Sequence, residues 1–266
     1  MRPTRAPPGR SQPSRAPRPG ARPGGAATPP EGVWLHGLHP VAAALANPAR
    51  RLRRLLLTPE AEAELARRCP PPWRIAAEAV DRGRFATFLP PDSVHQGAAL
   101  LAEPLSPPPL ERVVEGSTGP VLVLDQVTDP RNVGAILRSA AAFGAAAVVM
   151  QERHAPPETG ALARAASGAL EILPVLREVN LSRAIASLKK LGLWVVGLEA
   201  AGPITLAQSG LTGRRVALVL GAEGEGLRRL TRESCDELVR LPINPAMESL
   251  NVSAAAAVAL YELSRE

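Results

Sequence analysis

The most promising chemistry in this 266-residue chain lies in a polar stretch, residues 125–138, that follows an apolar run. It holds Arg131, Asn132 and Arg138, and the two arginines are seven residues apart, or about 20° apart around a helix. They therefore share one helix face, where guanidinium groups can grip phosphate or ribose oxygens bidentately. By themselves the arginines are equally compatible with a solvated surface pair, and Asn132 with a hydrogen bond at the start of the helix.

A second stretch, residues 220–226, has its glycines spaced as Gly-x-x-Gly-x-Gly. Three glycines allow a tight turn whose backbone approaches a ligand closely and could hydrogen-bond an adenine or a ribose. The spacing differs from those of a P-loop and of a dinucleotide-binding fold, which argues against an ATP hydrolase and a nicotinamide-dependent oxidoreductase. Glu223 and Glu225 would stand at the start of a helix predicted over residues 226–231, where they could act as caps because carboxylates are stabilised there.

The third stretch, residues 247–253, introduces a helix that continues towards the C-terminus. Either Ser249 or Asn251 is a suitable N-cap for that helix, and the residue types alone favour this structural role. A functional role for the two residues depends on their position after the glycine-rich stretch.

Alternating strands and helices must hold these stretches in place. From residue 120 onwards, apolar runs predict buried strands separated by helices, which is typical of βαβ units and an α/β fold with a parallel sheet. The expected strands are residues 121–124, 146–150, 193–197, 216–220 and 238–242. Asp129 and Pro130 are a good N-cap and a good first helical residue, so a helix should begin directly after the first strand. Gly144 should end that helix.

Composition divides the chain into a basic tail, a small α/β domain, a Pro- and Gly-rich linker and the domain with the three stretches, over residues 1–30, 31–105, 106–119 and 120–266. The tail is expected to be disordered, and it is either a solvated tail or a non-specific RNA tether. In the small domain, apolar spacing predicts a helix after Gly37 and another over residues 59–68. Strands are expected at residues 52–57 and 97–102.

Charge and composition narrow the classes of function. The formal net charge of +6 comes from the tail, because the tail has six arginines and no acid, whereas the remaining residues carry 25 basic and 25 acidic side chains. Any RNA-binding patch outside the tail must therefore come from local clustering. Cys69 and Cys235 make no disulfide framework and no residue cluster suits a metal, so we expect a cytoplasmic protein without zinc. Neither a membrane span nor a targeting helix is expected, since no apolar run is long enough and the tail has nine prolines.

In order, spacing and residue types, the three stretches resemble the signature motifs of the SpoU-type RNA ribose 2′-O-methyltransferases. This resemblance implies a parallel sheet with a deep trefoil knot, a bound S-adenosylmethionine and a homodimer with its sites near the subunit interface. Residues 35–41 and 94–97 also resemble the bacterial subfamily that methylates a guanosine of 23S rRNA, in which a ribosomal-protein-like N-terminal domain holds the RNA. Residues 245–248 resemble that subfamily less.

The resemblance also implies roles for individual residues. The positions that match the family's active site are Asn132, Arg138, Glu223, Ser249 and Asn251. The positions that match its cofactor site, largely through backbone atoms, are Leu198, Leu220, Gly221, Leu241 and Leu250. Arg138 is the family's proposed base, but a guanidinium is a very weak acid and resists deprotonation. We therefore expect Arg138 to orient a phosphate and to stabilise the developing 2′ oxyanion.

The expected function is methylation of a ribose 2′-hydroxyl in RNA, with S-adenosylmethionine as the donor and a guanosine of 23S rRNA or its precursor as the target. Two alternatives stay open: a tRNA target, and a non-catalytic RNA-binding or ribosome-assembly factor with the same fold. The presence of Arg138 and Asn251 argues against the second alternative. We expect RNA as a partner, neither DNA nor a membrane, and a homodimer that uses the alanine-rich residues 254–263 as its interface.

Overall fold

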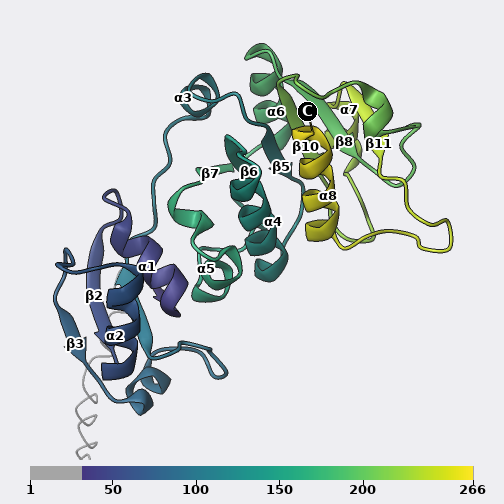
Figure 1. The fold of residues 1–266 in the computed structure, drawn as a ribbon. Helices are drawn as coiled ribbons and strands as arrows, with labels where there is room; N and C mark the ends of the chain where they lie inside the picture. The colour runs from purple at the N-terminus through teal and green to yellow at the C-terminus, as the bar shows by residue number, and fades with distance from the viewer. Residues whose placement is uncertain (1–31, 266) are drawn as a thin grey trace, which may run out of the picture. The chain divides into compact units, whose positions relative to one another are not determined.

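Seven parallel strands form the sheet that positions the three stretches (Figure 1). The structure is a computed structural model that describes residues 32–265, and the predicted tail over residues 1–30 lies outside them. The strands are β5 (Val121–Leu124), β6 (Ala147–Gln151), β7 (Val175–Glu178), β8 (Trp194–Leu198), β9 (Ile204–Thr205), β10 (Val216–Leu220) and β11 (Glu237–Arg240). Their order is β7-β6-β5-β10-β8-β11-β9, and every neighbouring pair is parallel.

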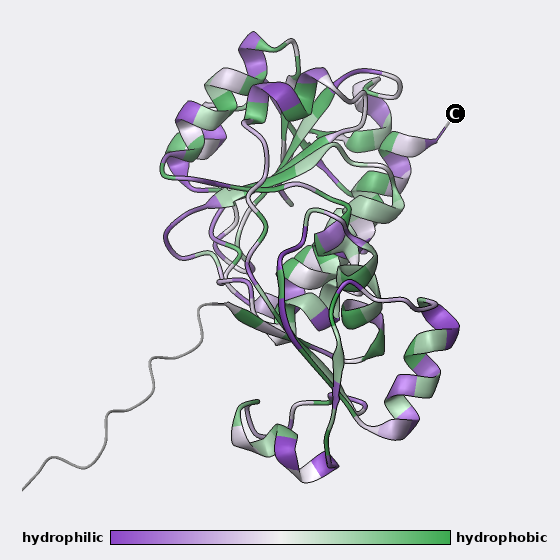
Figure 2. Cartoon of the chain, turned by 90° about the vertical axis from the view of Figure 1, so that its left-hand side faces the viewer, coloured by the Kyte–Doolittle hydropathy of each residue, from purple (hydrophilic) through white to green (hydrophobic). Residues whose placement is uncertain are grey.

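Helices cover both faces of this sheet because its central strands are apolar on both sides. β5 and β10 are buried along their whole length, and Figure 2 shows the central strands as hydrophobic segments. Leu122 and Leu124 enter one buried cluster, whereas Val121 and Val123 enter the other. The first cluster includes residues of α4 (Pro130–Ala142), α5 (Gly160–Ala166) and α8 (Val252–Ser264), and the second includes residues of α3 (Leu110–Glu115) and α6 (Leu181–Lys190). The predicted α/β fold with a parallel sheet is confirmed.

The helix α4 begins at the predicted residue. The Asp129 carboxylate accepts a hydrogen bond from the Arg131 backbone N–H at 2.9 Å, and Pro130 takes the first helical position. Beyond the other end, Gly144 has a φ of +68°, a conformation that favours glycine after a helix. Since α4 follows β5 within a few residues, the first polar stretch stands at the carboxyl edge of the sheet.

The N-terminal lobe, residues 32–105, has its own four-stranded sheet. Its strands are β1 (Val33–His36), β2 (Leu52–Leu57), β3 (Ala77–Ala79) and β4 (Ala98–Ala102), in the order β1-β4-β2-β3. Only the pair β2–β3 is parallel. The helices are α1 (Leu38–Ala46), α2 (Pro59–Arg68) and the 3-10 helix η1 (Arg82–Thr87). The two helices and two strands predicted here are confirmed to within a residue.

One local prediction is wrong, and one segment holds more structure than expected. The segment predicted as a linker contains the short helix α3, because Leu110 and Val114 are one helical turn apart and bury together under the larger sheet. The helix predicted over residues 226–231 begins later, as α7 (Arg229–Glu233), because the glycine-rich turn lasts until Gly226 and Arg228 is the N-cap.

The N-terminal lobe contacts the C-terminal lobe, residues 120–265, along α5. Gly160 of α5 lies so close to β1 that a Cβ there would be 2.3 Å from the His36 ring. Residues of both lobes share one buried cluster. The domain boundaries at residues 105 and 120 stay a prediction. Among residues 32–265, no helix combines the length and the apolar character needed to cross a membrane.

Candidate active site

The first two polar stretches meet because β5 and β10 are neighbours. The Asp125 backbone N–H donates to the Leu220 carbonyl at 2.8 Å, which continues the parallel pairing to the last residue of β10. The third stretch joins them through α8, which packs on α4. All three stretches therefore lie at the carboxyl edge of the sheet, where open α/β folds bind their ligands.

One residue from each stretch enters a hydrogen-bonded cluster, Asn132–Glu223–Asn251. The carboxylate oxygen Oε1 of Glu223 accepts from Asn132 Nδ2 at 3.1 Å, from Asn251 Nδ2 at 2.5 Å and from the Val252 backbone N–H at 3.2 Å. Asn251 Nδ2 also donates to Asn132 Oδ1 at 3.1 Å. These bonds hold the glycine-rich turn against the starts of α4 and α8.

Asn251 combines two roles. Its side-chain oxygen caps α8 by accepting from the backbone N–H groups of Ser253 at 2.9 Å and Ala254 at 3.4 Å, which confirms the predicted cap. Its amide nitrogen meanwhile binds Glu223. The alternative role for Glu223, as a cap of the helix after the glycine turn, is not what the structure has. Its carboxylate binds the first residues of α8, where the helix dipole also favours a negative charge.

Arg138 and Ser249 stay outside this hydrogen-bonded cluster. Arg138 is exposed and lies six residues beyond Asn132, about 9 Å along the axis of α4. Within residues 32–265 its guanidinium makes no hydrogen bond or ion pair, and the exposed Ser249 hydroxyl makes none either. The structure therefore brings three of the five predicted catalytic residues together and leaves the other two available to a ligand.

The glycine-rich turn is built so that backbone approaches backbone. Ala222 and Gly226 exchange two hydrogen bonds, at 3.2 and 3.0 Å. A Cβ at Gly221 would lie 2.2 Å from the carbonyl carbon of Gly226, so only glycine fits there. Gly224 and Gly226 have positive φ values of 82° and 68°. No other described residue accepts a hydrogen bond from the backbone N–H groups of residues 223–225, so these groups can bind a ligand.

The predicted cofactor residues end three adjacent strands. Leu220 ends β10, its register partner Leu198 ends β8, and Leu241 directly follows β11. Leu220 is buried, Leu198 and Leu241 are half-buried, and Leu250 is 38% exposed. Together with Gly221 they provide an apolar edge beside free backbone donors. Their contact with a cofactor stays a prediction.

Sequence reasoning missed an ion pair under this turn, between the buried Asp125 and the half-exposed Arg228. The Asp125 carboxylate is fully buried and accepts from Arg228 Nε at 2.7 Å and from the Arg228 backbone N–H at 3.1 Å. The pair ties the end of the glycine-rich turn to β5. A carboxylate placed directly after an apolar strand was the available signal, but its partner lies 103 residues away in the sequence.

Comparisons with known proteins agree with this geometry. Residues 119–261 match the model of the SpoU rRNA Methylase family. The chain is 37% identical over 242 residues to the 23S rRNA (guanosine-2'-O-)-methyltransferase RlmB of Pseudomonas syringae pv. tomato, which covers 87% of this chain and 95% of that protein. The protein of the same name from Photobacterium profundum is 43% identical over 176 residues, which cover 65% of this chain and 71% of the relative.

A solved structure has the same fold. The SpoU methyltransferase AviRb from Streptomyces viridochromogenes, in complex with the cofactor AdoMet, is similar with a TM-score of 0.73 and 23% identity, over 88% of this chain and 89% of that chain. The family model covers more than half of the chain, and the Pseudomonas relative is matched over nearly its whole length. The resemblance of the three stretches is thus confirmed, and the chain belongs to the SpoU rRNA methylase family.

Proposed function

We propose that this protein transfers the methyl group of S-adenosylmethionine to a ribose 2′-hydroxyl in RNA, and that a guanosine of 23S rRNA is its target. The observation that carries the proposal is the Asn132–Glu223–Asn251 cluster, which joins all three family stretches at one edge of the sheet. The 23S rRNA target is supported by the Pseudomonas relative, because its match includes the N-terminal lobe. That match favours rRNA over the tRNA alternative.

The residues at the carboxyl edge fit this cofactor. The backbone N–H groups of residues 223–225 can bind polar edges of an adenosine, and Leu198, Leu220 and Leu241 can cover its apolar faces. When bound, S-adenosylmethionine supplies an electrophilic methyl group on a sulfonium. The Asn132–Glu223–Asn251 cluster holds the turn that would receive the cofactor, and it places α4 beside that turn.

Arg138 supplies the permanent positive charge for the other substrate. Its exposed guanidinium can bind an RNA phosphate bidentately and stabilise the negative charge that develops on the 2′ oxygen. A guanidinium has hydrogen-bond donors and no acceptor, so Arg138 orients the ribose rather than accepting the proton. The proton leaves through the neighbouring phosphate or through water.

Methylation of purified RNA tests this proposal. The full chain, labelled S-adenosylmethionine and unmodified rRNA should give 2′-O-methylation at one guanosine of 23S rRNA. The same nucleotide should be unmethylated in rRNA from a strain that lacks the protein. Methylation of tRNA alone would support the tRNA alternative. Cofactor-dependent RNA binding without methylation would support a non-catalytic factor.

We also propose a homodimer that uses the outer face of α8. Val258 and Tyr261 are 47% and 57% exposed although they belong to an alanine-rich helix, and such exposed apolar side chains are typical of an interface. Tyr261→Glu should shift the protein from dimer to monomer in sedimentation at micromolar concentration. A wild-type monomer would contradict the proposal.

Three further family properties belong to the same proposal. They are the trefoil knot, the ribosomal-protein-like fold of the N-terminal lobe and the division of the chain at residues 106–119. The insertion of β10 between the earlier strands β5 and β8, with the return of α8 onto α4, supports the knot. The cytoplasmic location stays a prediction.

A further inference from the structure

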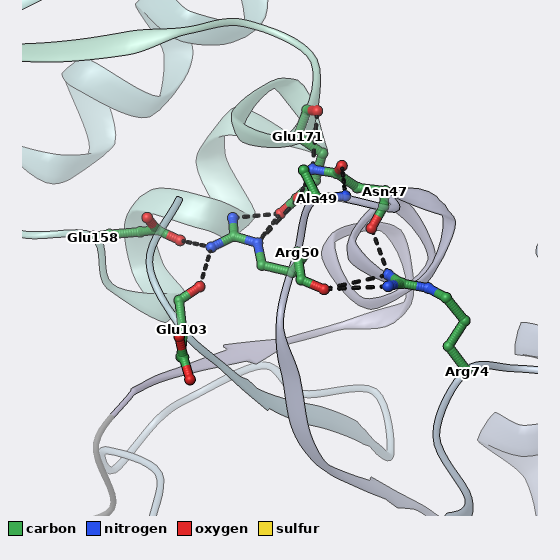
Figure 3. A network of polar contacts seen from close by, with 7 residues as sticks. All are labelled: Asn47, Ala49, Arg50, Arg74, Glu103, Glu158 and Glu171. Atoms are coloured by element: carbon green, nitrogen blue, oxygen red, sulfur yellow. Dashed lines mark hydrogen bonds and ion pairs between the residues drawn. The ribbon is translucent and has the colours of Figure 1, made fainter. Parts of the chain in front are cut away.

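A buried arginine connects the two lobes. Arg50 lies in the turn between α1 and β2, and its side chain is fully buried. Its Nε and Nη2 donate to the Glu171 carboxylate, at 3.1 and 2.6 Å. Its Nη1 donates to Glu158 Oε1 and to the Glu103 carbonyl, both at 2.8 Å. Figure 3 shows the guanidinium enclosed by these three acceptors.

The two carboxylates flank one helix of the C-terminal lobe. Glu158 stands two residues before α5, and Glu171 ends the 3-10 helix η2 (Ala169–Glu171) that follows it. Asn47, in the same turn as Arg50, adds a hydrogen bond from Nδ2 to Glu171 Oε2 at 2.8 Å. One turn of the N-terminal lobe therefore holds the segments before and after α5.

This helix leads directly to the candidate active site. At the crossing of α5 with α4, a Cβ on Gly134 would lie 2.4 Å from the Ala165 Cβ and 2.8 Å from the Leu162 carbonyl oxygen. The two helix backbones are therefore in contact and cannot slide closer. Since α4 also carries Asn132 and Arg138, an unbroken path of packed elements joins the N-terminal lobe to the site.

The buried charges determine the geometry of the contact between the lobes more than they stabilise it. Burial raises the pKa of the Glu158 carboxyl despite the attraction of Arg50, and Glu171 adds repulsion. Apolar side chains of similar volume often stabilise a protein as much as a buried ion pair does. A bidentate arginine, however, donates to its carboxylates in only one geometry. The Arg50–Glu158–Glu171 cluster therefore fixes how the lobes meet.

We propose that Arg50 is a positioning residue for the RNA substrate. By locking the N-terminal lobe onto α5, it fixes the distance between RNA held by that lobe and the ribose presented to Arg138. This inference rests on the proposed function, and it concerns RNA but not the cofactor, whose proposed site lies within the C-terminal lobe. A displacement of about 1 Å at a reacting centre can cost about 100-fold in rate.

Glu171→Gln tests this role, and Glu78→Gln is its matched control. In both places one carboxylate binds the Nε and Nη2 of an arginine, but Glu78 and its partner Arg54 are about half exposed and lie within one lobe. We expect Glu171→Gln to raise KM for 23S rRNA by about tenfold or more, with the Kd for S-adenosylmethionine within about twofold of wild type. Glu78→Gln should leave both constants unchanged.

Several outcomes would overturn the positioning role. They are an unchanged KM in Glu171→Gln, an equal increase in Glu78→Gln, and a parallel loss of cofactor affinity, which would indicate general destabilisation. If Glu171→Gln does not fold, Glu158→Gln replaces it, because the Glu158 side chain is 16% exposed and tolerates a change better. We expect the same result, a raised KM for RNA with an unchanged Kd for the cofactor. A wild-type protein that methylates no RNA would refute the proposed function instead. In that case the role of Arg50 in fixing the N-terminal lobe on α5 can still be tested separately. An unchanged rate of hydrogen exchange in α5 of Glu171→Gln would overturn that role.

Discussion

The Asn132–Glu223–Asn251 cluster and the Arg50–Glu158–Glu171 cluster both join segments that are far apart in the sequence. The first lies in exposed surroundings and contains one charge and two neutral amides. The second surrounds a fully buried guanidinium with two carboxylates. A site that admits a ligand must keep its polar groups hydrated, whereas a fixed contact between lobes can exclude water if its charges are paired. The first cluster should therefore govern activity, and the second should govern stability and geometry.

The largest expected effect on stability comes from emptying the buried cluster. Arg50→Ala leaves Glu158 and Glu171 without their shared counter-charge, so the free energy of unfolding should fall by about 3–5 kcal/mol. Urea unfolding measures this loss. Arg54→Ala, which breaks an exposed pair with Glu78, should cost less than about 1 kcal/mol. Equal losses in the two variants would contradict the contrast between the clusters.

Arg138→Ala should instead reduce activity without affecting stability. Methyl transfer should fall about 100-fold or more, on the order of 3 kcal/mol of transition-state stabilisation, with cofactor affinity nearly intact. Arg183→Ala, an exposed arginine on α6, is the control and should retain full activity. Single-turnover rates provide the measurement.

The variant Arg138→Lys distinguishes a residue that binds a phosphate bidentately from one that acts as a general base. A lysine has a pKa of about 10.4 and is the more accessible base, but it lacks the bidentate geometry of arginine. If Arg138 orients the phosphate, the Lys variant should stay poor at every pH. Recovery of its activity at high pH would indicate a base.

A smaller effect is expected from Glu223→Ala. The turn loses its bonds to Asn132 and Asn251, so methyl transfer should fall about tenfold through poorer preorganisation. The free energy of unfolding should change by less than about 1 kcal/mol, because the cluster is exposed. Glu115→Ala removes an exposed carboxylate of α3 that makes no hydrogen bond to any described residue, and it should leave activity unchanged. Similar losses in both variants would remove the special role of Glu223.

The smallest expected effect is on pH dependence. Since burial raises the pKa of Glu158 above its usual 4.5, the folded protein binds a proton there more readily than the unfolded chain does. Stability from this group is therefore present at low pH and is lost as pH rises from about 4.5 through the raised value. We expect Glu158→Gln to remove this contribution to the pH dependence of the free energy of unfolding, which urea unfolding measures between pH 4 and 7. An identical slope in wild type and variant would argue against a buried, proton-binding Glu158.

Local sequence signals determined the secondary structure and the three functional stretches. Asp129 and Pro130 mark the start of α4 because capping depends on neighbouring residues, and the apolar run of β10 marks a strand buried on both faces. Asn251 was one of two cap candidates for the same reason, and the structure has it as the cap. The one wrong helix boundary was local as well, because the glycine turn delays the start of α7. Leu110 and Val114 form a helix that the prolines and glycines around them did not indicate.

Only the tertiary structure decided which distant groups meet. Glu223 binds the first residue of α8 rather than the helix that follows it because β10 lies beside β5, where α4 and α8 converge. Arg50 reaches Glu171, 121 residues away, and no spacing rule predicts such a pair. Sequence periodicity reports which face of an element is apolar, but it does not report which elements become neighbours. Those pairings are set by the strand order and by how the lobes pack, and they place the polar groups of this protein.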